Sequence, residues 1–286
     1  MPMRRPLAIL VAVLLAALLP VACGGDDEPE PDAGELLAEA CSNHPESGKA
    51  SATVKLQAEG AEALDDGVEL RLSGPFSREG VAFDVSAVGL VPGLAGRITA
   101  TRDNLWLSFA GRSYEAGEGL VGSLLSEVLG HARKQHGDGA RAGVARWLTD
   151  ARVDGEEELD GEDATKVVAK LDGAAVAADV AGLAGDAGRE LSDEDREIVG
   201  RLLGDVTVTV WVAGSDTTVR RLAARASFEV PETLRDRVLG AERGRLELDL
   251  TLTDVGEPQE IEVPEDARPL DELLRQFGLS LEMLRP

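Results

Sequence analysis

Residues 205–230, DVTVTVWVAGSDTTVRRLAARASFEV, decide the fold together with residues 244–255, GRLELDLTLTDV. Apolar and polar residues alternate along three runs, and Gly-Ser-Asp at 214–216 has the composition of a turn. Strict alternation is typical of strands with one face in a core and the other in water. The sequence therefore predicts three long antiparallel strands that share one apolar face. The residues of that face are Val206, Val208, Val210 and Val212, then Leu222, Ala224, Ala226 and Phe228, then Leu246, Leu248, Leu250 and Leu252.

The same alternation appears earlier in the chain, where it predicts six strands and then one hairpin. The segments are 50–58, 68–74, 81–90, 97–111 (two strands), 113–116 and 151–171 (the hairpin). Asp103-Asn104 and Asp160-Gly161 tolerate tight turns, so we expect the chain to reverse there. The total is about eleven strands, and a sheet of that width has to curl.

Helices are expected where the apolar period changes from two to about 3.6. The segments are Leu36 to Cys41, residues 120–135, 140–151, 174–185 and 192–204, and Leu270 to Leu274 with Phe277. The segment 120–135 places Leu120, Leu124, Leu125 and Val128 on one stripe. Helices inserted between groups of strands are the natural cover for a curled sheet. The predicted fold class is α+β: a single large curled antiparallel sheet, a half-barrel, with helices on its concave face.

The first 22 residues have the layout of a signal peptide. Two arginines precede an uncharged apolar run from Leu7 to Leu19, which is shorter than the roughly 20 residues of a membrane span. Small residues then lead to Cys23. This resembles the lipobox of bacterial lipoproteins, whose cysteine carries diacylglycerol and becomes the mature N-terminus, although Pro20 stands where leucine is usual. The alternative is a plain secreted protein cut near Ala22.

Residues 23–34 are expected to form a disordered acidic tether, because glycine, acids and proline dominate them. The two acyl chains of a diacylglycerol are about the minimum for stable attachment to a bilayer. The sequence thus predicts a signal peptide at 1–22, this tether, and one folded domain at 35–286. The protein is expected to be lipid-anchored on the extracytoplasmic face of the plasma membrane, in the cell envelope.

The chain carries a formal net charge of −24 and loses two more positive charges with the signal peptide. A surface this acidic repels nucleic acid and anionic headgroups, so nucleic acid is excluded as a partner. If Cys23 is lipidated, Cys41 has no partner for an intrachain disulfide. Cys41 is either a reactive thiol or a small buried residue at the end of an apolar pattern, and we expect the second.

No catalytic signature is present, and neither an enzyme nor a cofactor is predicted. The sequence lacks G-x-S-x-G, G-x-x-x-x-G-K-[ST] and H-E-x-x-H. His131 and His136 are five residues apart, which does not place both on one helix face to bind a metal, and His44 is also expected in solvent. The acidic run at 154–163 lacks the spacing of a Ca²⁺ loop and is interpreted as two strand ends and a turn.

Segment 147–173, WLTDARVDGEEELDGEDATKVVAKLDG, follows the expected helical insert. It resembles a strand pair of the LppX/LprAFG family of actinobacterial lipoproteins, with the pattern a-x-V-x-G-x-E-x-x-x-G-x-x-T. The residues in comparable places are Val153, Gly155, Glu156, Gly161 and Thr165. The strand pair around Trp211 and the end EIEVPEDARP, residues 260–269, are also similar. The resemblance covers residues 35–267, and the abundance of Arg, Ala and Gly fits actinobacterial coding.

Members of that family are similar to LolA-type carriers, half-barrels whose apolar cavity holds acyl chains. The resemblance implies a non-catalytic lipoprotein, with palmitate as a term for its lipid modification, that binds or transfers lipids or glycolipids and has their acyl chains as partners. The residues expected to line the cavity are Leu120, Leu124, Leu125, Val128, Trp147, Val208, Val210, Leu222, Phe228, Leu248 and Leu250.

Two alternatives stay open. The stripe from Leu120 to Val128 is either ordinary core packing or the lining of a cavity, because alanine- and glycine-rich helices either leave a roomy space or pack flush on the sheet. The alternative function is an envelope interaction or regulatory module, in which the half-barrel is filled by its own helices and the surface binds an envelope protein.

Overall fold

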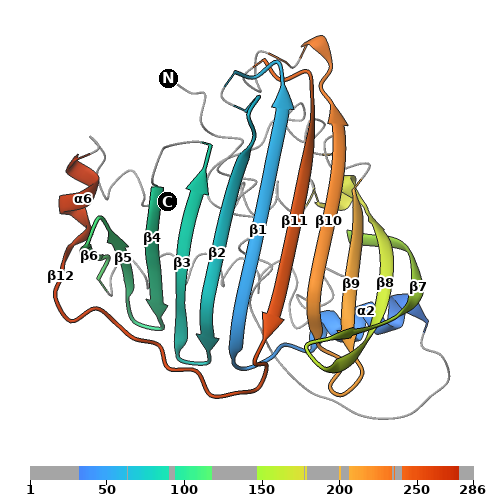
Figure 1. Cartoon of the computed structure of the whole chain (residues 1–286), viewed down its shortest axis with the longest axis horizontal. Coiled ribbons are helices and arrows are strands. Elements are labelled where there is room, and N and C mark those ends of the chain that lie inside the picture. Colours follow the sequence, from blue (N-terminus) through green and yellow to red (C-terminus); the bar gives the residue numbers. More distant parts are fainter. Residues whose placement is uncertain are drawn as a thin grey trace.

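The structure, a computed structural model, describes residues 32–62, 64–89, 94–117, 147–176, 206–233 and 240–276, with 178, 200 and 235 as single residues. These residues form one sheet of 12 strands that curls without closing (Figure 1). The strands are β1 (Gly48–Glu59), β2 (Val68–Ser77), β3 (Gly80–Val88), β4 (Leu94–Thr101), β5 (Leu105–Phe109), β6 (Arg112–Glu115), β7 (Leu148–Leu159), β8 (Glu162–Leu171), β9 (Thr207–Ala213), β10 (Val219–Glu229), β11 (Arg243–Thr253) and β12 (Ala267–Pro269). The single curled antiparallel sheet predicted from the sequence is confirmed.

The order of strands across the sheet is β12-β6-β5-β4-β3-β2-β1-β11-β10-β9-β8-β7. Every neighbouring pair is antiparallel except β12 and β6, which are parallel. The first and last thirds of the chain meet near the middle of the sheet, where β1 pairs with β11 (Figure 1). Strand β12 comes in addition to the predicted strands, because three residues are too few to show alternation.

Side chains separate onto two faces as the alternation predicts. One row of direct cross-strand neighbours passes through Val167, Val210, Leu222, Leu250, Ala52, Leu72, Val85, Gly96 and Phe109, from β8 to β5. The next row holds Ala169, Val208, Ala224, Leu248, Val54, Leu70 and Ala87. All members are apolar or glycine, so the rows define one continuous surface, the apolar face. The alternate residues of each strand form the polar face.

Both predicted hairpin turns are confirmed. Asp160 (φ +55°) and Gly161 (φ +83°) join β7 to β8 in the left-handed region that a tight two-residue hairpin requires. At the turn between β4 and β5, the side-chain oxygen of Asn104 accepts hydrogen bonds from the N–H groups of Leu105 (2.8 Å) and Gly117 (2.9 Å). These bonds tie the start of β5 to the end of β6.

Helix α2 (Ala33–Ser42) covers one end of the apolar face. Its N-cap is Asp32, whose carboxylate accepts hydrogen bonds from the N–H groups of Gly34 (2.8 Å) and Glu35 (3.3 Å). Because of this cap the helix begins at Ala33 rather than Leu36, so the last two residues assigned to the tether are helical. Its buried side chains, Ala33, Leu36, Leu37 and Ala40, pack in one cluster with residues of β8, β9 and β10. Strands β7 to β9 curl around the helix (Figure 1).

The helix predicted at 140–151 is wrong over its last four residues. Leu148 begins β7 and pairs with Leu171 of β8. Pairing with a long neighbouring strand outweighs the helical period of so short a segment, and Asp150 (φ +53°) lies where the register shifts. Residues 140–146, with Val144, lie outside the described residues.

The remaining predicted helices are described in part. Residues 173–176 are helical, and the carboxylate of Asp172 accepts hydrogen bonds from the N–H groups of Ala174 and Ala175 (both 3.0 Å). Segment 120–135 and most of 192–204 lie outside the described residues. Helix α6 (Leu270–Gln276) confirms the predicted C-terminal helix, except for Phe277, which is not among the residues described. No described helix is long and apolar enough to cross a membrane.

Candidate functional site

Six of the residues predicted to line a cavity lie on the apolar face. They are Val208 and Val210 on β9, Leu222 and Phe228 on β10, and Leu248 and Leu250 on β11. Val210, Leu222 and Leu250 are direct cross-strand neighbours. Phe228 lies further along β10 opposite Gly244, where the missing side chain leaves room for the aromatic ring. The structure brings these residues together on one surface, and their contact with a ligand stays a prediction.

The burial of the apolar face changes from strand to strand. On β8 and β9 it is complete, since Val167 is 0% and Val210 is 2% exposed. Toward the middle of the sheet the corresponding side chains are only half-buried; they include Val54, Leu70, Leu222, Leu248 and Leu250. We call these five residues, on β1, β2, β10 and β11, the central apolar surface. The same rows of residues are therefore closed to solvent on β8 and β9, and they are partly exposed in the middle except at Leu72 and Ala87, which are 8% and 5% exposed.

Three buried clusters lie around the central apolar surface. The first joins α2 to β8 and β9 through residues such as Leu37 and Val210. The second, at the ends of β1, β10 and β11, comprises Ala58, Ala61, Leu64, Val230 and Ala241. The third packs Tyr114 of β6 on Leu270 of α6. Burial in these clusters stabilises the frame of the sheet, and of the central apolar surface only Leu222 packs against one of them, the cluster beneath α2.

Trp147 lies next to β7, the edge strand of the sheet, and not on the strands of the central apolar surface. It is half-buried and precedes β7, and its carbonyl oxygen accepts a hydrogen bond from the N–H of Asp172 (2.6 Å). The remaining predicted residues, Cys23, Leu120, Leu124, Leu125 and Val128, lie outside the described residues. The structure adds Val54 and Leu70 to the surface. The alternation of segments 50–58 and 68–74 was the signal that pointed to them.

The polar face carries a closed network of charged contacts. The ring of Trp211 lies 4.8 Å from the guanidinium carbon of Arg221, and its Nε1 donates a hydrogen bond to Glu157 (2.8 Å). Arg221 also forms an ion pair with Asp249 (2.6 Å). Each group in this network has a partner, so the network holds β7, β9, β10 and β11 side by side rather than offering free donors to a ligand.

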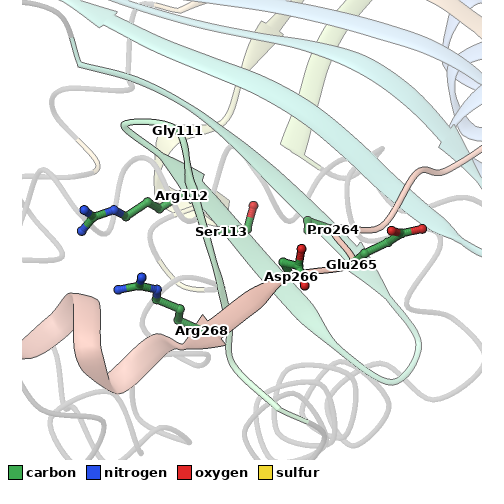
Figure 2. A pocket seen from close by; sticks show the side chains of 7 residues that line it. All are labelled: Gly111, Arg112, Ser113, Pro264, Glu265, Asp266 and Arg268. Carbon is green, nitrogen blue, oxygen red and sulfur yellow. The ribbon is translucent and has the colours of Figure 1, made fainter.

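A polar pocket of about 540 Å³ lies at the edge of the sheet formed by β6 and β12. It is lined by Gly111, Arg112, Ser113, Pro264, Glu265, Asp266 and Arg268. Figure 2 shows the guanidinium groups of Arg112 and Arg268 on one side of the pocket, and the carboxylates of Glu265 and Asp266 directed away from them. Sequence reasoning missed this site because its two sides come from segments about 150 residues apart.

Cys41 lies in the last turn of α2 and is half-buried. Burial raises the pKa of its thiol from 9.0 to about 11. A thiol that is protonated at neutral pH is a poor nucleophile, which agrees with the expected role of a small packed residue. Within the described part of the chain, no group of three or more His, Cys, Asp or Glu residues is placed to hold a metal ion.

Fold and surface together define a half-barrel protein, with one curled open sheet and an apolar face that is half-buried at its centre. The chain is similar to solved structures of two mycobacterial proteins. LprF from Mycobacterium bovis has 16% identity and a TM-score of 0.44, with 83% of this chain and 99% of that chain covered. The Mycobacterium tuberculosis lipoprotein LppX has 14% identity and a TM-score of 0.34, with 90% and 100% covered. Both are proteins of the LppX/LprAFG kind that the sequence resembles.

A third similar structure is the MucA/MucB complex of Pseudomonas aeruginosa, with 13% identity and a TM-score of 0.30, where 82% of this chain and 62% of that chain are covered. No protein-family model matches the sequence, and no curated protein matches it.

Proposed function

We propose that the protein binds or transfers acyl lipids on its apolar face, as a membrane-anchored lipoprotein of the cell envelope that performs no catalysis. The observation that carries the proposal is the central apolar surface, where aliphatic side chains stay half-buried in rows that are fully buried beneath α2. Burial recovers about 25 cal/mol for each Å² of apolar surface, and about 0.8 kcal/mol for each methylene of a bound chain. When an acyl chain lies on this surface, apolar area of the protein and apolar area of the chain are both removed from water.

The chemistry of the surface favours an acyl chain over a polar ligand. The two rows that cross it hold only aliphatic side chains, alanine, glycine and one phenylalanine. Side chains of this kind offer neither hydrogen-bond donors nor acceptors, so a ligand is held by its shape and its apolar area. The ligand class is therefore a lipid or glycolipid whose acyl chains lie here and whose headgroup lies elsewhere.

The location follows from the N-terminal sequence. Cys23 carries diacylglycerol after residues 1–22 are removed, and the acidic residues that follow form a spacer before the lipid-binding domain at 35–286. The acidic character of the chain, whose full sequence has a formal net charge of −24, holds that domain away from an anionic bilayer. Replacing Cys23 by serine tests the anchor: the protein moves from the membrane fraction to the soluble fraction or stays unprocessed. Unchanged membrane attachment with normal processing contradicts it.

Native mass spectrometry of the full chain, purified without added lipid, tests the binding function. The expected spectrum contains adducts with the masses of acyl lipids, and solvent extraction of the same sample releases those lipids. A sample without adducts that also takes up no lipid from vesicles contradicts the proposal. That result favours the alternative of an envelope interaction or regulatory module whose half-barrel is filled.

A further inference from the structure

One row of the apolar face ends in a cation. Beyond Phe109 on β5, the next cross-strand neighbour in the row is Arg112 on β6. Arg268 on β12 pairs with Tyr114, which is two residues from Arg112 and so lies on the same face of the sheet. Both arginines therefore stand at the margin of the apolar face, on neighbouring strands, next to the half-buried side chains of β5.

The two arginines have few competing partners. Arg112 is exposed, and its side chain makes no hydrogen bond or ion pair with any described residue. The carboxylate that pairs with Arg268 is that of Glu272, at 3.9 Å, in an exposed contact. The other two acids of the pocket, Glu265 and Asp266, point away from the guanidinium groups (Figure 2). The pair thus keeps most of its donors available.

Two neighbouring positive charges repel each other, and an anion placed between them removes that repulsion. Guanidinium groups bind phosphate with paired hydrogen bonds, more strongly than they bind neutral acceptors. The protein as a whole carries a net charge of −24 and repels anions, so a local pair of arginines is a place where an anionic group is selectively attracted. The pocket of about 540 Å³ beside the pair has room for a phosphate headgroup.

We propose that Arg112 and Arg268 bind a phosphate group at the margin of the apolar face. The phosphate belongs to the headgroup of the lipid whose acyl chains lie on the apolar face, so the inference rests on the proposed function. The row that leads from Arg112 through Phe109 and Val85 connects the headgroup site with the central apolar surface. The ligand class narrows to phospholipids and phosphorylated glycolipids. Inorganic phosphate has the same anionic chemistry as a phosphate headgroup. The experiment therefore has to distinguish binding of free phosphate from binding of a lipid headgroup.

The experiment compares the full-length wild type with the double variant Arg112→Gln and Arg268→Gln. A second double variant, Arg225→Gln and Arg245→Gln, is the matched control, because it removes the same charge from two exposed arginines on the polar face of β10 and β11. Vesicles of the uncharged glycolipid digalactosyldiacylglycerol carry a trace of fluorescent phosphatidylglycerol, or of fluorescent diacylglycerol with the same acyl chains. Extraction of each probe is measured, and binding of inorganic phosphate is measured separately by calorimetry.

The wild type is expected to extract phosphatidylglycerol in preference to diacylglycerol. The Arg112/Arg268 variant is expected to extract phosphatidylglycerol about tenfold less well and diacylglycerol equally well, while the control variant behaves as the wild type. If the wild type extracts neither lipid but binds inorganic phosphate, and the Arg112/Arg268 variant does not, the arginine site stands and the lipid-binding function is contradicted. The inference is overturned if the Arg112/Arg268 variant extracts phosphatidylglycerol and binds phosphate just as the wild type does.

Discussion

Two regions of the apolar face lie on different strands of the same sheet and have the same alternation and the same kinds of residues, yet they differ in burial. Beneath α2, Val167 and Val210 are closed to solvent. In the central apolar surface, Leu250 comes from the same row and Leu248 from the next row, and both stay half-buried. Hydrophobicity does not distinguish the regions, since both are aliphatic. The difference separates a region that stabilises the fold from the region that we propose for a ligand.

The largest expected effect is on stability, from Leu37→Ala in α2. Leu37 is 2% exposed and packs in the cluster with β8 and β9, so its truncation leaves a cavity and lowers the free energy of unfolding by about 3 kcal/mol. Leu248→Ala removes the same atoms from the half-buried surface and lowers it by about 1 kcal/mol. Chemical denaturation of the full chain measures both values. Equal losses at the two positions contradict the distinction between the regions.

The second prediction concerns the thiol at the end of α2. The pKa of Cys41 is raised by burial to about 11, two units above its ordinary value of 9.0. At pH 8 the thiolate fraction, and with it the rate of alkylation by iodoacetamide, is therefore about 100-fold lower than for a free cysteine. The rate in denaturant is the control, because unfolding restores the ordinary pKa. If Cys41 is alkylated in the native protein nearly as fast as in denaturant, its thiol is not buried against the neighbouring strands, and the prediction is contradicted.

The third prediction concerns lipid on the central apolar surface. Leu248→Asp places a charge on that surface and is expected to lower the amount of co-purified lipid about tenfold. Thr251→Asp is the matched control: it adds the same charge to the same strand on the polar face, opposite Arg221. Phosphate analysis and mass spectrometry of the extracted lipid measure the effect. Equal loss of lipid in both variants points to net charge or folding rather than to the central apolar surface.

The smallest expected effect is the pH dependence of the turn that holds the end of α2. The side-chain nitrogen of Asn43, after the helix, donates to the carbonyl oxygens of Asp216 and Thr217 (both 3.4 Å) in the turn from β9 to β10. Burial raises the pKa of Asp216, but hydrogen bonds from Arg220 and Thr218 outweigh that effect and lower it below its ordinary value.

Because the pKa of Asp216 is lower in the folded state, the carboxylate stabilises the fold fully above the unfolded pKa of about 3.9. That contribution is lost as the pH falls through the folded pKa. Asp216→Asn is therefore expected to reduce the stability at pH 6 and to flatten its decline between pH 4 and pH 2. Asp66→Asn, in an exposed turn of the other half of the sheet, is the control. Parallel pH curves for wild type and Asp216→Asn contradict the prediction.

Much of the fold was predictable because its signals are local. Alternation along β9, β10 and β11 defined which side chains share a face, and Asp160-Gly161 marked a hairpin through its own backbone preferences. The predicted helix at 140–151 failed at Leu148, where pairing with β8 decides the structure and no local signal records it. Strand β12 was missed for the same reason, since its three residues are a strand only because β6 lies beside them.

The candidate site was predictable in its residues but not in its burial. The pattern placed Val210 and Leu250 on one face, yet nothing in it tells that the first is covered by α2 and the second is not fully buried. Burial depends on which distant segment packs against a strand, and that segment lies about 170 residues earlier in the chain. The pair Arg112 and Arg268 is a second example, because only the parallel pairing of β6 and β12 brings the two arginines together.

Photo-crosslinking with an acyl lipid tests the central claim most directly. A phosphatidylglycerol with a diazirine near the end of one acyl chain is bound to the full chain, irradiated, and mapped by peptide mass spectrometry. Adducts are expected on peptides of β1, β2 and β11 that contain Val54, Leu70 or Leu248, and none on Val167 or Val210 beneath α2. Adducts confined to the polar face, or no adducts in a folded protein, contradict the claim that the centre of the apolar face binds lipid.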